Sequence, residues 1–196
     1  FTMRNVNINN PYCAQNGDGI DVESCNYVHI YDSVFETGDD AICLKSGKNR
    51  EARKLGKPCE NVYIHNCTVG QSHGGFVIGS EMSRGIYNVL VKDCTFIDSD
   101  IGVRMKSAIG RGGVVRDIYI ENVNMANIKE QSVILTMDYV LNSLGKDEAD
   151  AIAQDLEDVP EFTEIYFKNC NCVNAGKPVT ILPLEDYPTN INNVWF

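Results

Sequence analysis

Several features are missing from this sequence, and each absence excludes a class of protein. No run of about 18 apolar residues occurs, so we expect no transmembrane helix. No basic segment followed by an apolar stretch opens the sequence, so we expect no secretion signal within it. No two cysteines are separated by two residues, which is the spacing typical of zinc sites. We therefore expect neither a metal nor another cofactor.

The composition is that of an ordinary folded protein with a surplus of acidic residues. The chain has 196 residues, 43% of them hydrophobic and 22% charged, which is enough for one sizeable core. The formal net charge is −10, so we expect no binding to nucleic acid or to an anionic membrane. We interpret the eight cysteines mainly as small buried residues, with a disulfide framework as the alternative.

A short β-rich pattern recurs along the chain. Two apolar positions flank one other residue, usually after Asn or Asp, and a second apolar alternation follows most copies after 14 residues. Alternation with period two predicts strands that bury one face. Two or three short strands per copy, with little helical pattern, predict an all-β solenoid of about six or seven coils whose strands pair in parallel. The copies start at Val6, Val28, Val62, Val89, Ile118, Ile165 and Val194.

Two segments interrupt this repeat within what we expect to be a single domain over residues 1–196. Residues 45–58 form a basic insertion, which we expect to be a loop. Residues 141–162 form an acidic insertion with apolar residues at helical spacing, which predicts one short helix on the outside of the solenoid. The apolar residues of that helix are Ala149, Ile152, Ala153 and Leu156.

The 14-residue spacing brings polar residues of neighbouring coils into register. Asp18 and Asp40 each lie two residues before an inward-pointing isoleucine, so we expect them on adjacent coils about 4.8 Å apart at the backbone. Asp39 lies beside Asp40, and the next step of 34 residues puts His73 on the row of Asp39. The charged residues expected to point outward on the following strands are Asp21, Glu23, Lys45, Arg104 and Lys106.

Stacked carboxylates of this kind suit one particular chemistry. Three close carboxylates cannot all ionise freely, so at least one pKa should rise. One raised and one ordinary carboxyl group on either side of a bond is the arrangement that glycoside hydrolysis requires. The alternative is that these aspartates only cap backbone N–H groups at the corners, which we favour for any single aspartate but not for the whole set.

Four short motifs occur in a fixed order along the chain. They are Asn16-Gly17-Asp18, Gly38-Asp39-Asp40, Ser72-His73-Gly74 and Arg104-Met105-Lys106, with Gly79-Ser80-Glu81 between the last two. The set resembles the motifs of glycoside hydrolase family 28, the polygalacturonases, which read Asn-Thr-Asp, Gly-Asp-Asp, Gly-His-Gly and Arg-Ile-Lys. The departures at Gly17, Ser72 and Met105 remove no reacting group, although Ser72 belongs to the turn that precedes His73.

The resemblance implies a right-handed parallel β-helix and an inverting hydrolase that cleaves α-1,4-galacturonosyl bonds. It implies Asp39 as the general acid, with Asp18 and Asp40 holding and deprotonating the attacking water. His73 would then maintain the protonation state of Asp39. The residues that it implies for binding galacturonate are Arg104, Lys106 and Tyr139, and we add Lys45 from the outward-pointing row.

Other functions remain open at this point. They are a hydrolase of rhamnogalacturonan or another uronate polymer, a calcium-dependent pectate lyase, and a β-helix that binds carbohydrate without cleaving it. The resemblance also implies a pectic polysaccharide as partner and a secreted or periplasmic location. Because the family usually carries further coils before the first motif, we expect the chain to be a fragment, with the missing N-terminal part of the same β-helix as a further partner.

Overall fold

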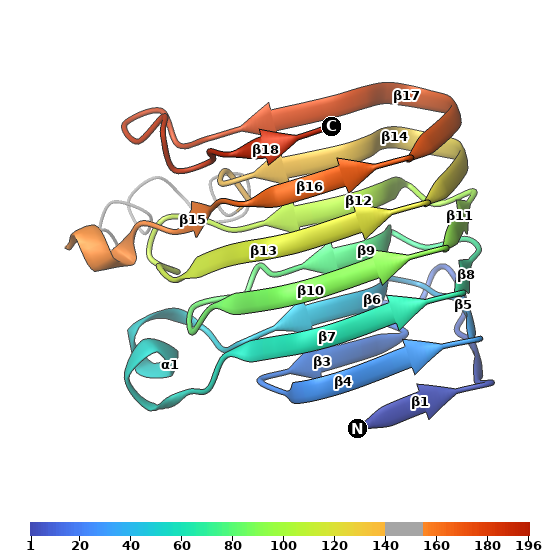
Figure 1. Cartoon of the computed structure of the whole chain (residues 1–196), viewed down its shortest axis with the longest axis horizontal. Helices are drawn as coiled ribbons and strands as arrows, with labels where there is room; N and C mark the ends of the chain where they lie inside the picture. Colours follow the sequence, from blue (N-terminus) through green and yellow to red (C-terminus); the bar gives the residue numbers. More distant parts are fainter. Residues whose placement is uncertain (140–154) are drawn as a thin grey trace.

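The computed structural model describes residues 1–139 and 155–196 of the chain. Corresponding strands of successive coils stack in parallel along one axis, so the chain is a parallel β-helix (Figure 1). This confirms the predicted fold class. Among the described residues, no helix has the length and the apolar character needed to cross a membrane.

One sheet carries the recurring pattern. Within the described residues seven of its strands follow one another in coil order, each hydrogen-bonded to the next, and β15 adds to β13. Its strands are β1 (Thr2–Arg4), β4 (Asn26–Tyr31), β7 (Cys59–His65), β10 (Ile86–Lys92), β13 (Val114–Glu121), β15 (Glu161–Phe162), β16 (Ile165–Lys168) and β18 (Val194–Trp195).

The second sheet makes the other walls of the coil. Its long strand β14 pairs with β11 near its beginning and with β12 near its end, so it joins two walls, and β17 pairs with it along most of its length. The strands are β2 (Asn7–Asn9), β3 (Ile20–Glu23), β5 (Val34–Glu36), β6 (Asp40–Lys45), β8 (Thr68–Val69), β9 (Gly74–Ile78), β11 (Thr95–Ile97), β12 (Ile101–Lys106), β14 (Asn124–Thr136) and β17 (Asn171–Leu182).

Asparagine or aspartate makes the corner after six strands of the first sheet, namely β1, β4, β7, β10, β13 and β16. Four residues after the start of each copy, the chain adopts a positive φ that only Gly, Asn and Asp take readily. Several of these side chains also bond to the corner of the next coil, as Asn122 Nδ2 does with Asp93 Oδ1 at 2.8 Å. The corner residues are Asn5, Asp32, Asn66, Asp93, Asn122 and Asn169.

The corners show that the prediction for the first coil is wrong. Thr2 lies opposite His29 in the pairing of β1 with β4, so the first copy starts at Phe1 and not at Val6. Apolar alternation alone does not distinguish the two starts, because both segments expose one face. The left-handed Asn5 marks the corner between them and assigns Val6 to the turn before the second sheet.

The core fills the space between the walls, as the alternation predicts. Side chains from the two sheets meet in one cluster, with Phe35, Phe76 and Phe96 fully buried at its centre. The row of residues five positions after the pattern start also lies inside, since Cys67, Cys94 and Val123 are at most 1% exposed, while Cys170 is half-buried. All eight cysteines are free, which argues against the disulfide framework, but only Cys43, Cys59, Cys67 and Cys94 are buried as the interpretation expects, and Cys13 and Cys172 are exposed.

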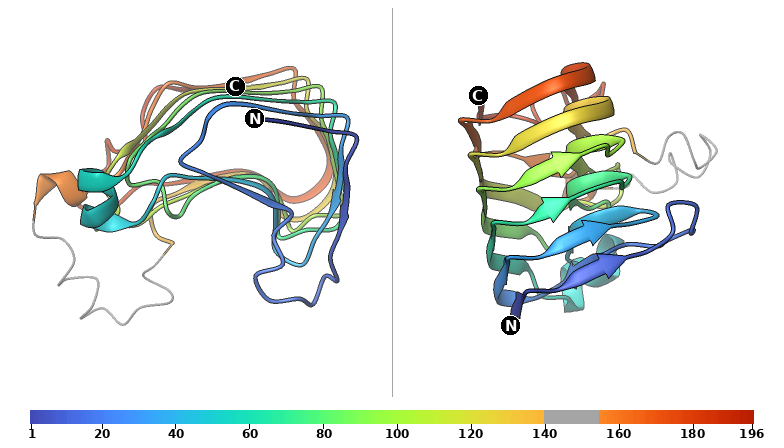
Figure 2. Two further views of the ribbon diagram at one scale, coloured as in Figure 1. Left: turned by 90° about the horizontal axis from the view of Figure 1, so that it is seen from below. Right: turned by 90° about the vertical axis from the view of Figure 1, so that its right-hand side faces the viewer.

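The basic insertion is not a plain loop but contains helix α1 (Asn49–Leu55). Most of its residues are good helix formers. Glu51 in the first turn and Arg53 and Lys54 in the last turn interact favourably with the helix dipole. The periodicity missed it because none of its residues is buried, so it has no apolar face. The helix lies beside the 3₁₀ helix η1 (Leu156–Asp158) of the acidic insertion (Figure 2).

Ion pairs join these two insertions. The guanidinium of Arg50 donates to Asp155 Oδ2 at 2.6 Å and to Asp158 Oδ2 at 3.0 Å, and Arg53 also pairs with Asp158. The Asp158 side chain is only 1% exposed, so its charge depends on these arginines. Of the helix predicted in the acidic insertion, Ala149, Ile152 and Ala153 lie outside the described residues, and Leu156 begins η1.

Candidate active site

The pairing of β3, β6, β9 and β12 brings the predicted site residues together on the outer face of the second sheet. Gly19 N donates to Asp40 O at 2.9 Å, and Ile20 lies opposite Ile42, so Asp18 stacks beside Asp40. His73 N donates to Asp39 O at 3.0 Å, which places His73 on the row of Asp39. The strand register is therefore the one that the spacing predicts.

A cavity of about 320 Å³ opens on this outer face. Its lining combines three aspartates of the predicted site with two lysines, one tyrosine and the turn after β9. Arg104 and His73 are not among the lining residues and lie at its margin. The lining residues are Asn16, Asp18, Asp21, Asp39, Asp40, Lys45, Gly79, Ser80, Glu81, Lys106 and Tyr139.

Asp40 and Lys106 form a buried ion pair at the floor of the cavity. Lys106 Nζ lies 2.7 Å from Asp40 Oδ2, and the two side chains are 8% and 2% exposed. Burial, the largest influence, lowers the pKa of Lys106, but the charge and the hydrogen bond of Asp40 together help to raise that pKa above its usual value. The other oxygen, Asp40 Oδ1, is buried and has no protein hydrogen-bond partner. Asp40 therefore has one oxygen paired with Lys106 and one buried oxygen without a protein partner.

Asp18 is the carboxyl group whose pKa rises. Burial first, then the negative charges of Asp21 and Asp39, raise the pKa of Asp18 to about 6, while Lys45 opposes the rise. Lys45 Nζ lies 3.6 Å from Asp18 Oδ2 and 2.8 Å from Asp21 Oδ2, so one cation is shared by two carboxylates. A carboxyl group with this pKa takes up or releases a proton near neutral pH.

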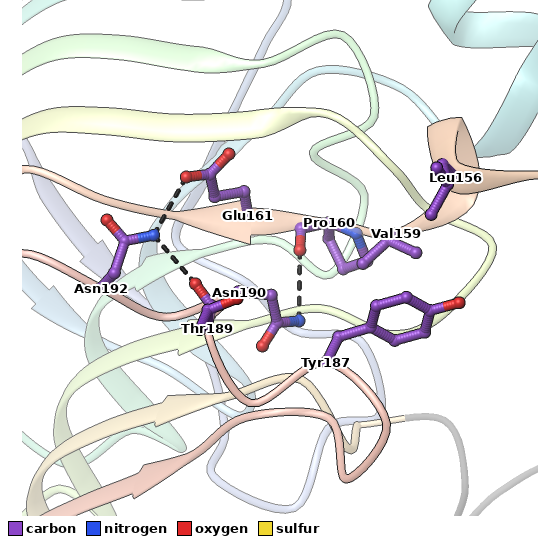
Figure 3. A pocket seen from close by; sticks show the side chains of 8 residues that line it. All are labelled: Leu156, Val159, Pro160, Glu161, Tyr187, Thr189, Asn190 and Asn192. Atoms are coloured by element: carbon purple, nitrogen blue, oxygen red, sulfur yellow. Dashed lines mark hydrogen bonds between the residues drawn. The ribbon is translucent and has the colours of Figure 1, made fainter.

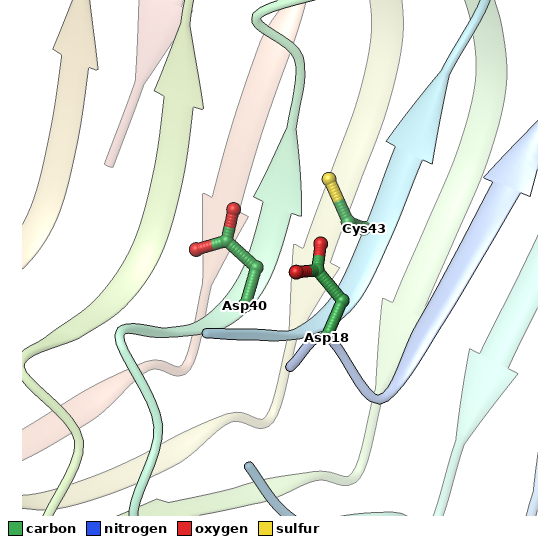
Figure 4. Close-up of side chains that lie close together, drawn as sticks. All are labelled: Asp18, Asp40 and Cys43. Carbon is green, nitrogen blue, oxygen red and sulfur yellow. The ribbon is translucent and has the colours of Figure 1, made fainter. Parts of the chain in front are cut away.

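The side chains of Asp18, Asp40 and Cys43 lie close together (Figure 4). Their two carboxylate oxygens and one sulfur lie within 4.8 Å of one another. The group does not suit a cation, because Lys45 and Lys106 already pair with both carboxylates and burial raises the pKa of the Cys43 thiol well above its usual value. The thiol donates instead to Gly79 O at 3.4 Å.

Asp39 sits on the more open side of the cavity. Its side chain is 26% exposed, and its Oδ1 accepts a hydrogen bond from Asp40 N at 2.9 Å. The same oxygen lies 3.5 Å from His73 Nδ1. Asp39 can therefore meet a bound molecule while its backbone neighbour and the imidazole hold its orientation.

Arg104, Lys106 and Tyr139 form one cationic group. The Arg104 guanidinium lies 5.3 Å and Lys106 Nζ 4.9 Å from the centre of the Tyr139 ring, so both cations face the same aromatic ring. The predicted trio is therefore brought together. Lys106 differs from the expectation of a free substrate-binding cation, because it is committed to Asp40.

Gly79 closes the turn that lines the far side of the cavity. Its φ is +88°, and a Cβ atom at this position would lie 2.1 Å from Lys106 O. Only glycine fits there, and the following Ser80 and Glu81 are held by the guanidinium of Arg111, at 3.4 Å from Ser80 Oγ and 3.7 Å from Glu81 Oε1.

Two residues near the site escaped the sequence reasoning. Cys43 could have been found, because it lies two residues before the outward-pointing Lys45 on the same strand. Tyr12 carried no signal, since it lies in the loop between β2 and β3, outside any repeat, and reaches His73 only through the tertiary structure.

A second and larger cavity, of about 450 Å³, lies between the segment 156–161 and the turn 187–192 (Figure 3). Both of its asparagines are paired: Asn192 Nδ2 donates to Glu161 Oε1 at 3.0 Å, and Asn190 Nδ2 to Pro160 O at 3.2 Å. Glu161 is the one carboxylate in its lining. The paired acids and cations that catalysis needs are therefore concentrated in the smaller cavity.

A parallel β-helix with acidic and basic side chains gathered on one outer face of a sheet indicates a class of carbohydrate-processing protein. The chain belongs to that class through glycosyl hydrolases family 28, whose family model matches residues 1–190.

Individual relatives agree with this assignment. The chain is 32% identical over 191 residues to an endo-polygalacturonase of Pectobacterium carotovorum subsp. carotovorum, covering 92% of this chain and 42% of the relative. It is 34% identical over 141 residues to an exo-poly-alpha-D-galacturonosidase of Dickeya chrysanthemi, covering 72% of this chain and 23% of the relative. The chain thus spans less than half the length of these relatives.

Solved structures share the fold. An exopolygalacturonase of Thermotoga maritima superposes with a TM-score of 0.83 at 30% identity, over 94% of this chain and 39% of that one. A polygalacturonase of Erwinia carotovora ssp. carotovora has a TM-score of 0.71 at 24% identity, over 98% and 51% of the two chains. The second likeness concerns the fold alone.

Proposed function

We propose that this protein hydrolyses the α-1,4-galacturonosyl bonds of polygalacturonate with inversion at the anomeric carbon. The observation that carries the proposal is the convergence of Asp18 and Asp40 within 4.8 Å in a cavity that Asp39 also lines. Inverting hydrolysis uses one carboxyl group as general acid and another to activate a water. Asp18 and Asp40 are close enough together to bind one water, and Asp39 faces the same cavity. Relatives that are polygalacturonases support the choice of substrate.

Asp39 is proposed as the general acid. It is the most exposed of the three carboxyl groups, so it can reach the bridging oxygen of a sugar bound in the cavity. Its proton passes to that oxygen as the bond to the anomeric carbon breaks. His73, 3.5 Å away, orients the carboxyl group and stabilises the charge left on it.

Asp18 and Asp40 divide the task of activating water. Lys106 neutralises Asp40, whose carboxylate accepts a hydrogen bond from the water and so orients it. Asp18 takes the proton that the water loses as its oxygen bonds to the anomeric carbon, because a pKa near 6 makes it the stronger base. The proton that Asp39 gave up and the one that Asp18 gained exchange with solvent after product leaves.

Cationic side chains of the cavity bind the uronate. Arg104 lies against Tyr139 and presents positive charge to a galacturonate carboxylate through its planar fork. Lys106 also lines the cavity and can offer a galacturonate oxygen the N–H donors that its pairing with Asp40 leaves over. Lys45 is 21% exposed in its side chain and adds a second cation. A local cationic group thus allows an acidic protein to bind a polyanion. Because pectic polymers lie outside cells, we propose that the protein acts outside the cytoplasm.

Product analysis of the full-length protein on polygalacturonate tests this function. We expect new reducing ends whose first-formed anomer, observed by proton NMR before mutarotation, is β, with Asp39→Asn as the inactive control. The α anomer would overturn inversion. Unsaturated, ultraviolet-absorbing products would indicate elimination instead, and binding without turnover would indicate a carbohydrate-binding protein.

A further inference from the structure

The loop before β3 reaches across several coils through one side chain. Tyr12 lies between β2 and β3, in the first coil, and this loop projects from the stack (Figure 2). The Tyr12 hydroxyl lies 2.8 Å from each carboxylate oxygen of Asp100, which is 88 residues away. The strand register puts Asp100 one coil beyond His73, because Ile101 lies opposite Gly74.

Lys129 completes a clamp around this tyrosine. Its Nζ donates to Asp100 Oδ1 at 2.8 Å and to the Tyr12 hydroxyl at 3.2 Å, and it lies 4.5 Å from the centre of the Tyr12 ring. The ammonium therefore meets the hydroxyl, the ring and the carboxylate together. We call the group of Tyr12, Asp100 and Lys129 the tyrosine clamp.

The clamped ring abuts the imidazole of His73. The two ring centroids lie 5.5 Å apart with perpendicular planes, the edge-to-face geometry that aromatic pairs favour. The His73 side chain is 41% exposed, and its distance of 3.5 Å to Asp39 is longer than a strong hydrogen bond. The Asp39 contact alone therefore leaves the imidazole loosely held, and the tyrosine supplies the second support.

We propose that Tyr12 is a positioning residue that holds His73 beside the general acid, and that Asp100 and Lys129 lock the tyrosine in place. The inference rests on the proposed function, since it assigns to the clamp a task in the same reaction. Tyr12 is not among the residues that line the cavity, and its ring contacts His73, so we assign its action to His73. Its removal lets the imidazole turn away from the carboxyl group that it orients.

A double-mutant cycle on the full-length protein tests this inference. Tyr12→Ala is expected to lower kcat on polygalacturonate about two- to tenfold, the range of one edge-to-face aromatic contact. In the His73→Ala background the same change is expected to alter kcat less than about twofold, because the imidazole through which Tyr12 acts is absent. Tyr12→Phe keeps the ring and loses the bond to Asp100, so it should lie between the wild type and Tyr12→Ala. Tyr27→Ala, at an exposed tyrosine, is the matched control.

A second measurement does not depend on turnover. Tyr12→Ala is expected to shift the NMR signals of the His73 ring protons, assigned by comparison with His73→Ala, and to leave those of His29 and His65 unchanged. An equal loss of kcat with and without His73, no loss at all, or unshifted His73 signals would overturn the positioning role. If the wild-type protein lacks turnover while the His73 signals still shift, the proposed function fails and the contact itself stands.

Discussion

Two opposite charges beside Asp18 should move the acidic limb of the pH–rate profile in opposite directions. Lys45 lowers the pKa of Asp18 and Asp21 raises it, within a rise dominated by burial. Under the proposed mechanism Asp18 must be ionised to accept a proton from water, so activity appears as pH rises through its pKa of about 6. Lys45→Met removes a favourable charge and should move the limb to higher pH, whereas Asp21→Asn should move it to lower pH.

The structure sets the size of the effect. Across the 3.6 Å between Lys45 Nζ and Asp18 Oδ2, Coulomb's law gives roughly 1 kcal/mol at the dielectric constant of water and roughly 5 kcal/mol at an effective value of 20. Lys45 is partly solvated and shared with Asp21, so we expect the lower end of this range. At about 1.4 kcal/mol per pKa unit, Lys45→Met should raise the limb from about 6 to about 7.

The assay is the pH dependence of kcat/KM on polygalacturonate, which reports the groups of the free enzyme. Lys92→Met, on the other sheet, is the matched control and should leave the limb in place. A direct carboxyl NMR titration of Asp18 in each variant would assign the shift. If Lys45→Met raises KM but leaves the limb unmoved, Lys45 acts only on substrate and the electrostatic reasoning is refuted. Shifts of the same sign in both variants would refute it as well.

Three further predictions concern the aspartates and their partners. Asp39→Asn should lower turnover by about 10²- to 10⁴-fold with unchanged binding of polygalacturonate in calorimetry, and a wild-type rate would remove Asp39 from its role. Lys106→Ala should destabilise the fold by about 3–5 kcal/mol in urea titration, because it leaves Asp40 buried without its cation. Adding Asp40→Asn should recover part of that loss, and a loss below about 1 kcal/mol would show that the pair is solvated. The raised pKa of Asp18 means that folding favours its neutral form, so its contribution to stability is lost as pH rises from about 4 through about 6. Asp18→Asn should therefore stabilise the protein by about 2–3 kcal/mol at pH 7 and by little at pH 4, and equal gains at both would contradict this.

The strands and their register could be predicted from the sequence because both depend on residues close together in the chain. Alternating apolar residues mark the buried face, and each corner needs a residue that tolerates a positive φ, so Asp32, Asn66 and Asp93 recur at one position of the repeat. Once the register is set, the stacking of Asp18 on Asp40 and of His73 on Asp39 follows from chain spacing alone.

The misses have physical causes too. The first coil was displaced because the apolar residues around Val6 alternate like those around Phe1. Helix α1 escaped because it buries none of its residues, so its stability comes from helix propensity and from the ion pairs of Arg50 and Arg53 with Asp158. Such pairs join residues about a hundred positions apart, and no repeat encodes them.

The sequence by itself determined the coil, the rows of residues along it and the outer face on which the acidic and basic residues gather. Only the tertiary structure decided which charges meet: Lys106 pairs with Asp40 rather than standing free, and Tyr12 crosses from the first coil to Asp100 and Lys129. A repeat specifies the position of each residue along the stack, because backbone hydrogen bonds impose it. The partner of a long side chain depends on its depth, its rotamer and the loops of other coils, which the repeat does not contain.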